Sequence, residues 1–353
     1  MSAEEKPVWV WLPSQARPVQ CGTFSLAGGI GTFHDLDAYR ERADALALDP
    51  FSLHFTRSRK GLRETRQGGL FGVFRDASPE GFGLALLEQI KGATLVDPLQ
   101  RLELSEGDGV GAVEVCDDIG VKAAYQPPPS AGLIAILAGL APERASSQAA
   151  REVKGLKGTS LGGERPKLTV LHKGQYWIAK LQDRGDPPHA PLREYLAMRL
   201  ARRCGVRAAE VEFVAVADRE MLLVKRFDRH VDPRGQVWRN LYASAHTVLR
   251  LDSQAPGERQ RSYVALAHEV QRWCGLADVN AAELKPITRA GSSLATRANL
   301  LATCGNFAYE PGEAQEYIEQ TLSTVATGWG AEQLACGFAP DTLAAPGFGW
   351  LAG

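Results

Sequence analysis

No stretch of about 18 uncharged apolar residues occurs in the 353-residue chain, which argues against a membrane-spanning helix. Residues 1–6 are charged and lack the apolar core of a signal peptide. The six cysteines are scattered, with no C-x-x-C pair and no histidine cluster, so a zinc site is not expected. Unpaired cysteines suit a reducing compartment. These absences predict a cytoplasmic protein.

The chain also has almost no net charge. The formal charge of −1 gives no overall field that would attract nucleic acid or a membrane. With 44% apolar and 23% charged residues, the composition is that of a globular protein. One local exception is a basic run made of Arg57, Arg59, Lys60, Arg63 and Arg66. We interpret it as a solvated loop or hairpin; the alternative is a surface that meets a partner or DNA.

Three common motifs of enzymes are missing. The P-loop pattern fails because Gly163 is followed by Glu164 and Arg165 instead of Lys and Ser or Thr. The glycines of 107–111 lack the Rossmann spacing and a following helix. No G-x-S-x-G elbow occurs, so hydrolase chemistry has no support.

The first third of the chain, residues 1–126, is expected to form a small α/β domain. The predicted elements are strands at 8–12 and 19–26, a glycine turn at 28–31, and helices at 36–48 and 79–90. The last helix would begin with Ser78 as its cap and Pro79 at its first position.

The rest of the chain follows a stiff proline-rich linker at 126–130. Residues 127–152 are expected to hold the linker and helices, and residues 153–353 a second domain. The predicted elements are helices at 131–140, 143–152, 191–204, 262–274, 295–304 and 311–325, and strands within 155–182, 211–216 and 221–224. Strands followed by helices predict an α+β fold.

Lys180 is the residue with the clearest chemical potential. It lies near the end of a predicted strand, after a glycine-rich stretch at Ser160–Lys167 and before Glu194 on an amphipathic helix. Glycines let backbone amides approach phosphate oxygens, a lysine neutralises them, and a glutamate orients the lysine, as in protein kinases. The spacing alone leaves a second interpretation open, namely a common glycine loop and a solvent-facing lysine.

The order of these segments resembles the HipA family of serine/threonine kinase toxins. The segments that carry the resemblance are Phe71–Gly81, Ser160–Lys167, Trp177–Lys180, Lys225–Arg229, Arg239–Leu249 and Asn299–Trp329. The family carries an S-x-x-G-x-x-P/E-K loop, an I-A-K strand and an R-F-D-R segment in this order. The resemblance implies a small N-terminal α/β domain followed by a two-lobed, protein-kinase-like domain with a mainly helical C-terminal part.

By the same resemblance the chain would bind ATP and Mg²⁺. The implied nucleotide-binding residues are Ser160, Gly162, Gly163, Lys167, Lys180, Glu194, Lys225, Phe227 and Asp228. Met221–Phe227 would form the hinge at adenine, and Arg226–Arg229 would brace it. Where the family usually has Glu, this chain has Lys225.

The resemblance also implies a role in a toxin–antitoxin pair. Members phosphorylate a serine of a protein in an ATP-dependent reaction. Their partner is a small helix-turn-helix antitoxin, and the implied contact with DNA is only indirect, through that antitoxin.

The catalytic segment of the family is missing from its expected place near 275–295. The family carries D-x-H-x-x-N and P-A-Y-D segments, but the four asparagines, at 240, 280, 299 and 306, have no aspartate five positions earlier. We therefore predict a degenerate form that binds nucleotide or antitoxin but lacks the base and the metal ligands. Asp278 is a weak candidate base, which we interpret as part of a helix-capping loop. The alternatives are a still-active kinase with a non-standard base, and a chain that folds poorly.

Overall fold

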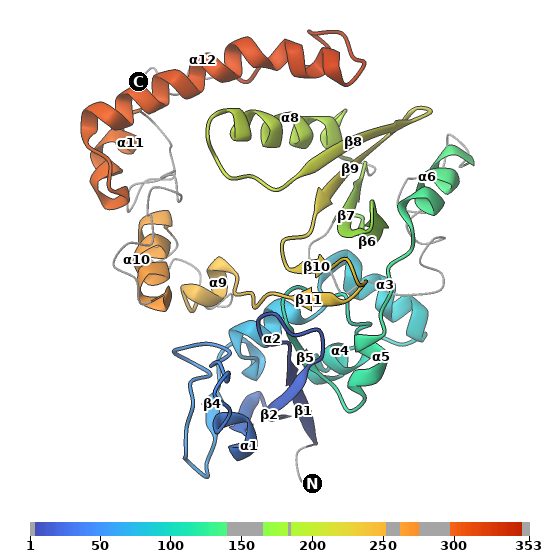
Figure 1. Cartoon of the computed structure of the whole chain (residues 1–353), viewed down its shortest axis with the longest axis vertical. Helices are drawn as coiled ribbons and strands as arrows, with labels where there is room; N and C mark the ends of the chain where they lie inside the picture. The colour runs from blue at the N-terminus through green and yellow to red at the C-terminus, as the bar shows by residue number, and fades with distance from the viewer. Residues whose placement is uncertain (1–3, 140–164, 183–184, 252–261, 275–296, 348–353) are drawn as a thin grey trace. The chain divides into compact units, whose positions relative to one another are not determined.

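The computed structural model describes residues 4–139, 165–182, 185–251, 262–274 and 297–347. The chain divides into two compact units. The first comprises Met1–Pro191 and Glu212–Thr247, and the second comprises Leu192–Val211 and Val248–Gly353. The mixed architecture of sheets followed by helices confirms the predicted α+β fold class (Figure 1).

The first unit begins with a five-stranded antiparallel sheet in the order β4-β3-β2-β1-β5. Its strands are β1 (Glu5–Val10), β2 (Val19–Ala27), β3 (Ile30–Asp35), β4 (Leu62–Glu64) and β5 (Val113–Val115). The strands β2 and β3 are joined by Gly28 and Gly29 alone, at φ of +57° and +73°. Positive φ at both residues is what a two-residue hairpin turn of type I′ requires, which confirms the predicted glycine turn.

Short helices lie between and after these strands in the sequence. They are α1 (Asp37–Arg40), η1 (Gln67–Gly69), α2 (Gly72–Ala77), α3 (Gly81–Lys91), α4 (Pro98–Leu104) and α5 (Ile119–Ala123). The helix α2 buries Val73, Phe74 and Ala77 in the core of the sheet. The Phe74 ring packs against Phe24 of β2, with the ring centroids 4.9 Å apart and the ring planes tilted by 58°.

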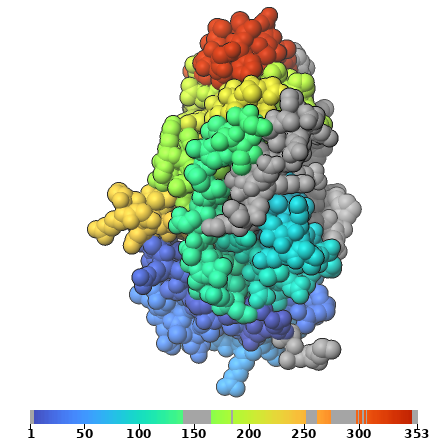
Figure 2. All heavy atoms as spheres, turned by 90° about the vertical axis from the view of Figure 1, so that its right-hand side faces the viewer, coloured from blue at the N-terminus to red at the C-terminus, as the bar shows by residue number. Residues whose placement is uncertain are grey.

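A second, four-stranded sheet follows in the same unit, in the order β6-β7-β9-β8. Its strands are β6 (Lys167–His172), β7 (Gln175–Leu181), β8 (Val211–Val216) and β9 (Arg219–Lys225). One face packs on α6 (Ser130–Gly139), which supplies Leu133 and Leu137, and on Phe82 and Leu86 of α3. Figure 2 shows α6, in green, at the surface of this unit. The helix α3, which precedes β5 in the sequence, therefore packs on the second sheet.

The first unit ends with a small hairpin and a short helix. The elements are β10 (Arg229–Val231), β11 (Val237–Arg239) and α9 (Ala245–Val248). In α2, the Asp76 carboxylate accepts hydrogen bonds from Ser244 N at 2.7 Å, from Ser244 Oγ at 2.7 Å and from Thr247 Oγ1 at 2.8 Å. Asp76 therefore braces the chain at the start of α9.

The second unit is helical. Its elements are α8 (Ala190–Arg203), α10 (Tyr263–Cys274), α11 (Arg297–Thr303), η3 (Cys304–Phe307) and α12 (Pro311–Ala335). The predicted start of α12 is confirmed, with Pro311 in its first turn and a capping box between Glu310 and Glu313. In α8, Arg199 and Arg203 both pair with the buried Glu332 of α12, at 3.3 and 2.8 Å.

Two predictions for the first unit were wrong. Residues 36–48 form a helix only at Asp37–Arg40. The chain then turns back, and Tyr39 Oη donates to Leu46 O at 2.8 Å, because this fold over the sheet buries Leu48 without a helix. Ser78 ends α2 and does not cap α3, whose cap position is Glu80. Pro79 excludes helical geometry at the residue before it.

Several other predictions agree with the described elements. The helix at 191–204 is α8, followed by Gly205 at φ +78°, and the strands at 211–216 and 221–224 are β8 and β9. The helix at 143–152 lies outside the described residues. Residues on both sides of 126 belong to the first unit, and the predicted domain boundaries stay predictions. In the described part of the chain, no helix has the length and apolar character needed to cross a membrane.

Candidate functional site

The two faces of the four-stranded sheet differ in chemistry. Paired residues on neighbouring antiparallel strands place their side chains on the same face. The face that packs on α6 carries the apolar side chains of Leu168, Val170, Trp177, Ala179, Leu181, Met221 and Leu223. By alternation, the opposite face carries Lys167, Lys180 and Leu222, which are paired across β6, β7 and β9.

Lys167 and Lys180 are thus brought together by the register of the β6–β7 hairpin. Each is half-buried. Like charges directly opposite each other in a sheet repel, unless a counter-charge lies near them. Both lysines were predicted as phosphate-binding residues from the sequence, and their pairing places two cations where one ligand could meet both.

Lys225 and Phe227 lie elsewhere. Lys225 pairs with Trp177 of the apolar face, so its side chain is on the face opposite to Lys180. Residues Met221–Lys225 pair along β7 as the strand β9, and Arg226 N donates to Tyr176 O at 2.9 Å. The backbone of the predicted hinge is therefore largely used in the sheet, and Phe227, with 57% of its surface exposed, is the first residue beyond it.

The position of the remaining predicted residues relative to this pair stays a prediction. Glu194 lies on α8, which is described with the second unit, and its ion pair with Lys180 stays a prediction. Four others, namely Ser160, Gly162, Gly163 and Asp278, lie outside the described residues.

Asp228 belongs to a buried ionic network at the end of β9. Its carboxylate accepts from Arg226 Nε at 2.9 Å and Nη2 at 2.7 Å, from Arg229 Nη1 at 2.9 Å and from Gly111 N at 2.8 Å. Four donors from three residues thus meet a carboxylate that is buried within the protein. Its placement matches the bracing role implied for Arg226–Arg229.

Arg226 connects this network to residues 108 and 109, which precede β5 of the five-stranded sheet. Its guanidinium donates to Asp108 O at 2.8 Å, Gly109 O at 3.0 Å and Thr169 Oγ1 at 3.0 Å, in addition to Asp228. All its donors therefore have partners, which a buried arginine requires. Burial raises the pKa of Asp228, but the charges of Arg229 and Arg226 outweigh burial and hold that pKa well below its usual range.

A second buried set lies beside the first. Arg239 Nη1 and Lys122 Nζ donate to the Glu114 carboxylate at 2.9 and 3.0 Å. Burial raises the pKa of Glu114, but Lys122 and Arg239 outweigh it and lower that pKa. Burial and the nearby Arg239 lower the pKa of Arg229.

Sequence reasoning missed the loop at 107–111, whose backbone carbonyls accept hydrogen bonds from the buried arginines. The glycines of 107–111 were considered only as a failed dinucleotide motif. Gly107 and Gly111 have φ of +85° and +86°, and a Cβ at Gly107 would lie 2.4 Å from Lys122 O. The glycines thus let the loop approach closely enough to present carbonyls to buried arginines. The available signal was a glycine-rich loop in one domain and an arginine-rich motif in the other.

A hydrogen-bonded chain anchors the start of α6 to this sheet. Ser130 Oγ lies 2.9 Å from His172 Nδ1, and His172 Nε2 lies 3.0 Å from Glu212 Oε2. Lys173 Nζ pairs with the same carboxylate at 2.6 Å. Ser130 is buried, so the chain holds α6 against β6 and β8.

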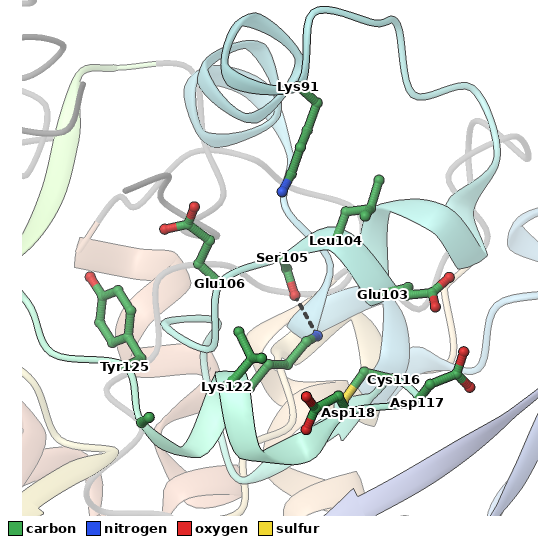
Figure 3. A pocket seen from close by; sticks show the side chains of 12 residues that line it. Lys91, Glu103, Leu104, Ser105, Glu106, Cys116, Asp117, Asp118, Lys122 and Tyr125 are labelled. Atoms are coloured by element: carbon green, nitrogen blue, oxygen red, sulfur yellow. Dashed lines mark hydrogen bonds between the residues drawn. The ribbon is translucent and has the colours of Figure 1, made fainter. Parts of the chain in front are cut away.

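A cavity of about 500 Å³ is lined by residues between Lys91 and Tyr125, and neither Lys167 nor Lys180 lines it (Figure 3). Figure 3 shows Lys91 reaching toward it from α3 and Lys122 hydrogen-bonded to Ser105. Its rim includes Glu103 and Asp117, which are paired with Lys6 at 2.8 and 2.7 Å. Its charged groups are thus largely occupied within the domain, and it contains none of the predicted site residues.

Among the described residues, no group of three or more His, Cys, Asp or Glu side chains is placed to hold a metal ion. Residues 275–295, where the catalytic segment of the family was expected and not found, lie outside the described part of the chain.

Comparison with curated proteins gives no match. Among solved structures, the chain resembles the complex of HipA, HipB and operator DNA from the toxin–antitoxin system of Shewanella oneidensis MR-1. The likeness covers 88% of this chain and 68% of that chain, with 18% sequence identity and a TM-score of 0.48.

Family models match both parts of the sequence. The HipA N-terminal domain matches residues 18–116, which include β2 to β5 of the first sheet. The HipA-like C-terminal domain matches residues 159–292, which include β6 to β11. Together the two matches span most of the first unit and part of the second, in the order that the motifs predicted. The chain therefore belongs to the HipA family.

Proposed function

We propose that this chain is a degenerate member of a toxin–antitoxin pair that binds Mg²⁺–ATP, transfers no phosphate and associates with a helix-turn-helix antitoxin. The observation that carries the nucleotide part is the cross-strand pair of Lys167 and Lys180 on one face of the sheet. The observation that carries the degenerate part is the lack of a D-x-H-x-x-N segment anywhere in the sequence.

Lys167 and Lys180 fit a phosphate group by their chemistry. Both ammonium groups could donate to the oxygens of one phosphate, in charge-assisted hydrogen bonds. The glycine-rich segment before Lys167 would add backbone amides, and Glu194 would orient Lys180. The bound nucleotide would supply the phosphate charge, and Mg²⁺ would enter with it.

Lys225 fits adenine less well than the family's usual glutamate does. Its side chain lies on the other face of the sheet, and the strand backbone before it is paired with β7. Adenine would then be held by groups near Phe227, whose ring is exposed and lies 5.6 Å from the Tyr242 ring, between centroids. Adenine would therefore be bound more weakly and less selectively.

Thermal shift with Mg²⁺–ATP tests nucleotide binding. A ligand at 100 times its dissociation constant stabilises the native state by about 2.7 kcal/mol, so the melting temperature must rise. We expect the rise in the unaltered chain and its loss in Lys180→Ala. Lys173→Ala is the matched control, because Lys173 lies in the turn of the same hairpin, 67% exposed, and pairs with Glu212. An absent shift in the unaltered, cooperatively folding chain would contradict nucleotide binding.

A phosphotransfer assay tests the degenerate state separately. Without a base and metal ligands, transfer to a serine should be many orders of magnitude slower, since positioning and charge stabilisation supply most of the catalysis. Measurable transfer by the purified chain would overturn this part and favour an active kinase with a non-standard base. Asp278→Asn would then show whether Asp278 is that base.

The antitoxin is proposed from family membership. The chain and a candidate helix-turn-helix protein from the same genome, produced together, should purify as one complex. Separate elution of two folded proteins would contradict the partner and would leave nucleotide binding untouched.

A further inference from the structure

The segment 57–66, which runs from the loop after α1 through β4, carries cations that the proposed function does not use. This basic loop comprises Arg57, Arg59, Lys60, Arg63 and Arg66, all of them exposed. No acidic residue occurs from 54 to 63. The segment leaves the sheet beside α1 in Figure 1 and protrudes at the lower edge of Figure 2.

The basic loop is held in place at its base and at its turn. Arg40 Nη1 donates to Thr56 O at 2.9 Å, and Thr56 N donates to Asp35 Oδ2 at 3.1 Å. Gly61 N donates to Ser58 O at 3.1 Å, and Gly61 has φ of +67°. The cations are therefore presented by a turn with a defined backbone, at less entropic cost than a free segment would need to bind a partner.

Most of the charge on the basic loop is not neutralised within the protein. Arg66 pairs with Glu64 at 3.1 Å. The other four cations of the loop form no ion pair with any residue that the structure describes. Nearby arginines outside the loop behave differently, since Arg40 pairs with Asp35 and Asp37. An uncompensated charge of four cations therefore faces solvent on a chain whose net charge is −1.

We propose that the basic loop binds the phosphate backbone of duplex DNA. DNA carries one negative charge per about 1.7 Å of its axis, and each cation that neutralises a phosphate releases a condensed counterion. A protein partner would need an apolar centre in the contact, and Phe55, 38% exposed, is the only large apolar side chain exposed along described residues 54–66. The loop thus has the charge that DNA requires without the apolar surface that a protein requires.

Contact through phosphates positions a protein without reading sequence. Arg63 extends the basic surface onto β4, the edge strand of the five-stranded sheet. The chain would then contact DNA itself, in addition to any contact through an antitoxin. This inference is independent of nucleotide binding and of phosphate transfer.

The test is the salt dependence of binding to a duplex of arbitrary sequence, measured by fluorescence anisotropy with the purified full chain. Four phosphate contacts predict that log K falls with log salt at a slope of about −3.6. The triple variant Arg57→Ser, Arg59→Ser and Lys60→Ser should reduce that slope to about −0.9, since each lost contact removes about one unit.

The matched control replaces three exposed cations elsewhere in the same unit, Arg17→Ser, Lys91→Ser and Arg234→Ser. Its slope should stay at about −3.6. Melting temperatures of all three proteins should agree, because exposed substitutions change stability by about 0.5 kcal/mol or less. An equal loss in the control, or no binding by the unaltered chain at low salt, would overturn the proposal. If polyglutamate binds as tightly as the duplex, the loop binds an acidic protein instead. If inorganic phosphate displaces the duplex at the same concentration of phosphate groups, the loop binds single anions.

Discussion

Asp228 shows, at the scale of one residue, how a buried carboxylate holds segments distant in the sequence. It neutralises Arg226 and Arg229 and accepts from the backbone of Gly111, more than 100 residues earlier. A buried ion pair adds little net stability when intact, because desolvation offsets attraction. The loss of one partner is costly, because it leaves a buried charge alone.

Asp228→Asn should therefore lower the free energy of unfolding by about 3–5 kcal/mol, since two arginines lose their counter-charge. Urea denaturation at neutral pH measures the change. The control is Asp37→Asn, because Asp37 pairs with Arg40 but its side chain is 81% exposed, and its loss should cost about 1 kcal/mol or less. Similar losses in the two variants would contradict the buried network.

The same carboxylate predicts a dependence on pH. Arg229 and Arg226 hold the pKa of Asp228 well below its usual range in the folded state. Its contribution to stability is present above the unfolded pKa of about 3.9 and is lost as pH falls toward the folded pKa. The unaltered chain should thus lose stability below about pH 5, and more steeply than Asp228→Asn does. Parallel curves of urea midpoint against pH would contradict this.

At the scale of elements, local chemistry predicted hairpins and long helices well. Gly28-Gly29 marked the β2–β3 turn, and the apolar spacing of 191–204 marked α8. The prediction of a helix at 36–48 failed because Leu48 is buried in the core of the sheet after a turn that Tyr39 closes. Apolar spacing cannot distinguish a helix from a segment that folds over a sheet.

Glycines in two elements predict opposite effects on stability. A Cβ at Gly31 in β3 would lie 1.9 Å from the backbone oxygen of Gly69, so Gly31→Ala should destabilise the protein by about 1–3 kcal/mol. Gly132 in α6 has no atom within 4 Å of such a Cβ. Gly132→Ala should stabilise by about 0.5–1 kcal/mol through helix propensity. Thermal denaturation of the two variants checks the signs, and a stabilising Gly31→Ala would contradict the close approach of β3 to Gly69.

In the second unit, one glutamine ties the segment after α12 to the helix. Gln333 Nε2 donates to Pro340 O at 2.7 Å, and its Oε1 accepts from Leu343 N at 2.7 Å. Gln333→Ala would leave those backbone groups without partners, at a cost of about 1–3 kcal/mol. Limited proteolysis should then cut after α12 sooner than in the unaltered chain. Gln315→Ala is the control, because Gln315 is exposed on the same helix, and it should leave the rate of cutting unchanged.

At the scale of the whole molecule, the two domains matched by the family models share packing within the first unit. Phe82 and Leu86 of α3 belong to the core of the second sheet, and Arg226 reaches the 108–109 carbonyls. A proline-rich linker in the sequence therefore does not mark a break in packing, since side chains on either side of it are buried together.

We expect the two sheets of the first unit to unfold in one transition. Hydrogen exchange in increasing urea should expose β1 and β7 at the same concentration, and Arg226→Ala should separate them. Arg66→Ala, which removes a half-exposed pair with Glu64, should keep them together. Exposure of β1 and β7 at clearly different urea concentrations in the unaltered chain would contradict the shared core.

The sequence by itself determined the family, the α+β class and the lack of the catalytic aspartate and asparagine segment. Folding cannot supply a side chain that the chain does not contain, so that lack is independent of how the chain folds. Only the tertiary structure decided that Lys167 and Lys180 share a face, that Lys225 lies on the other face, and that Asp228 is buried among arginines. Side chains alternate along a strand, so the face of each depends on strand register, which residues distant in the sequence set together.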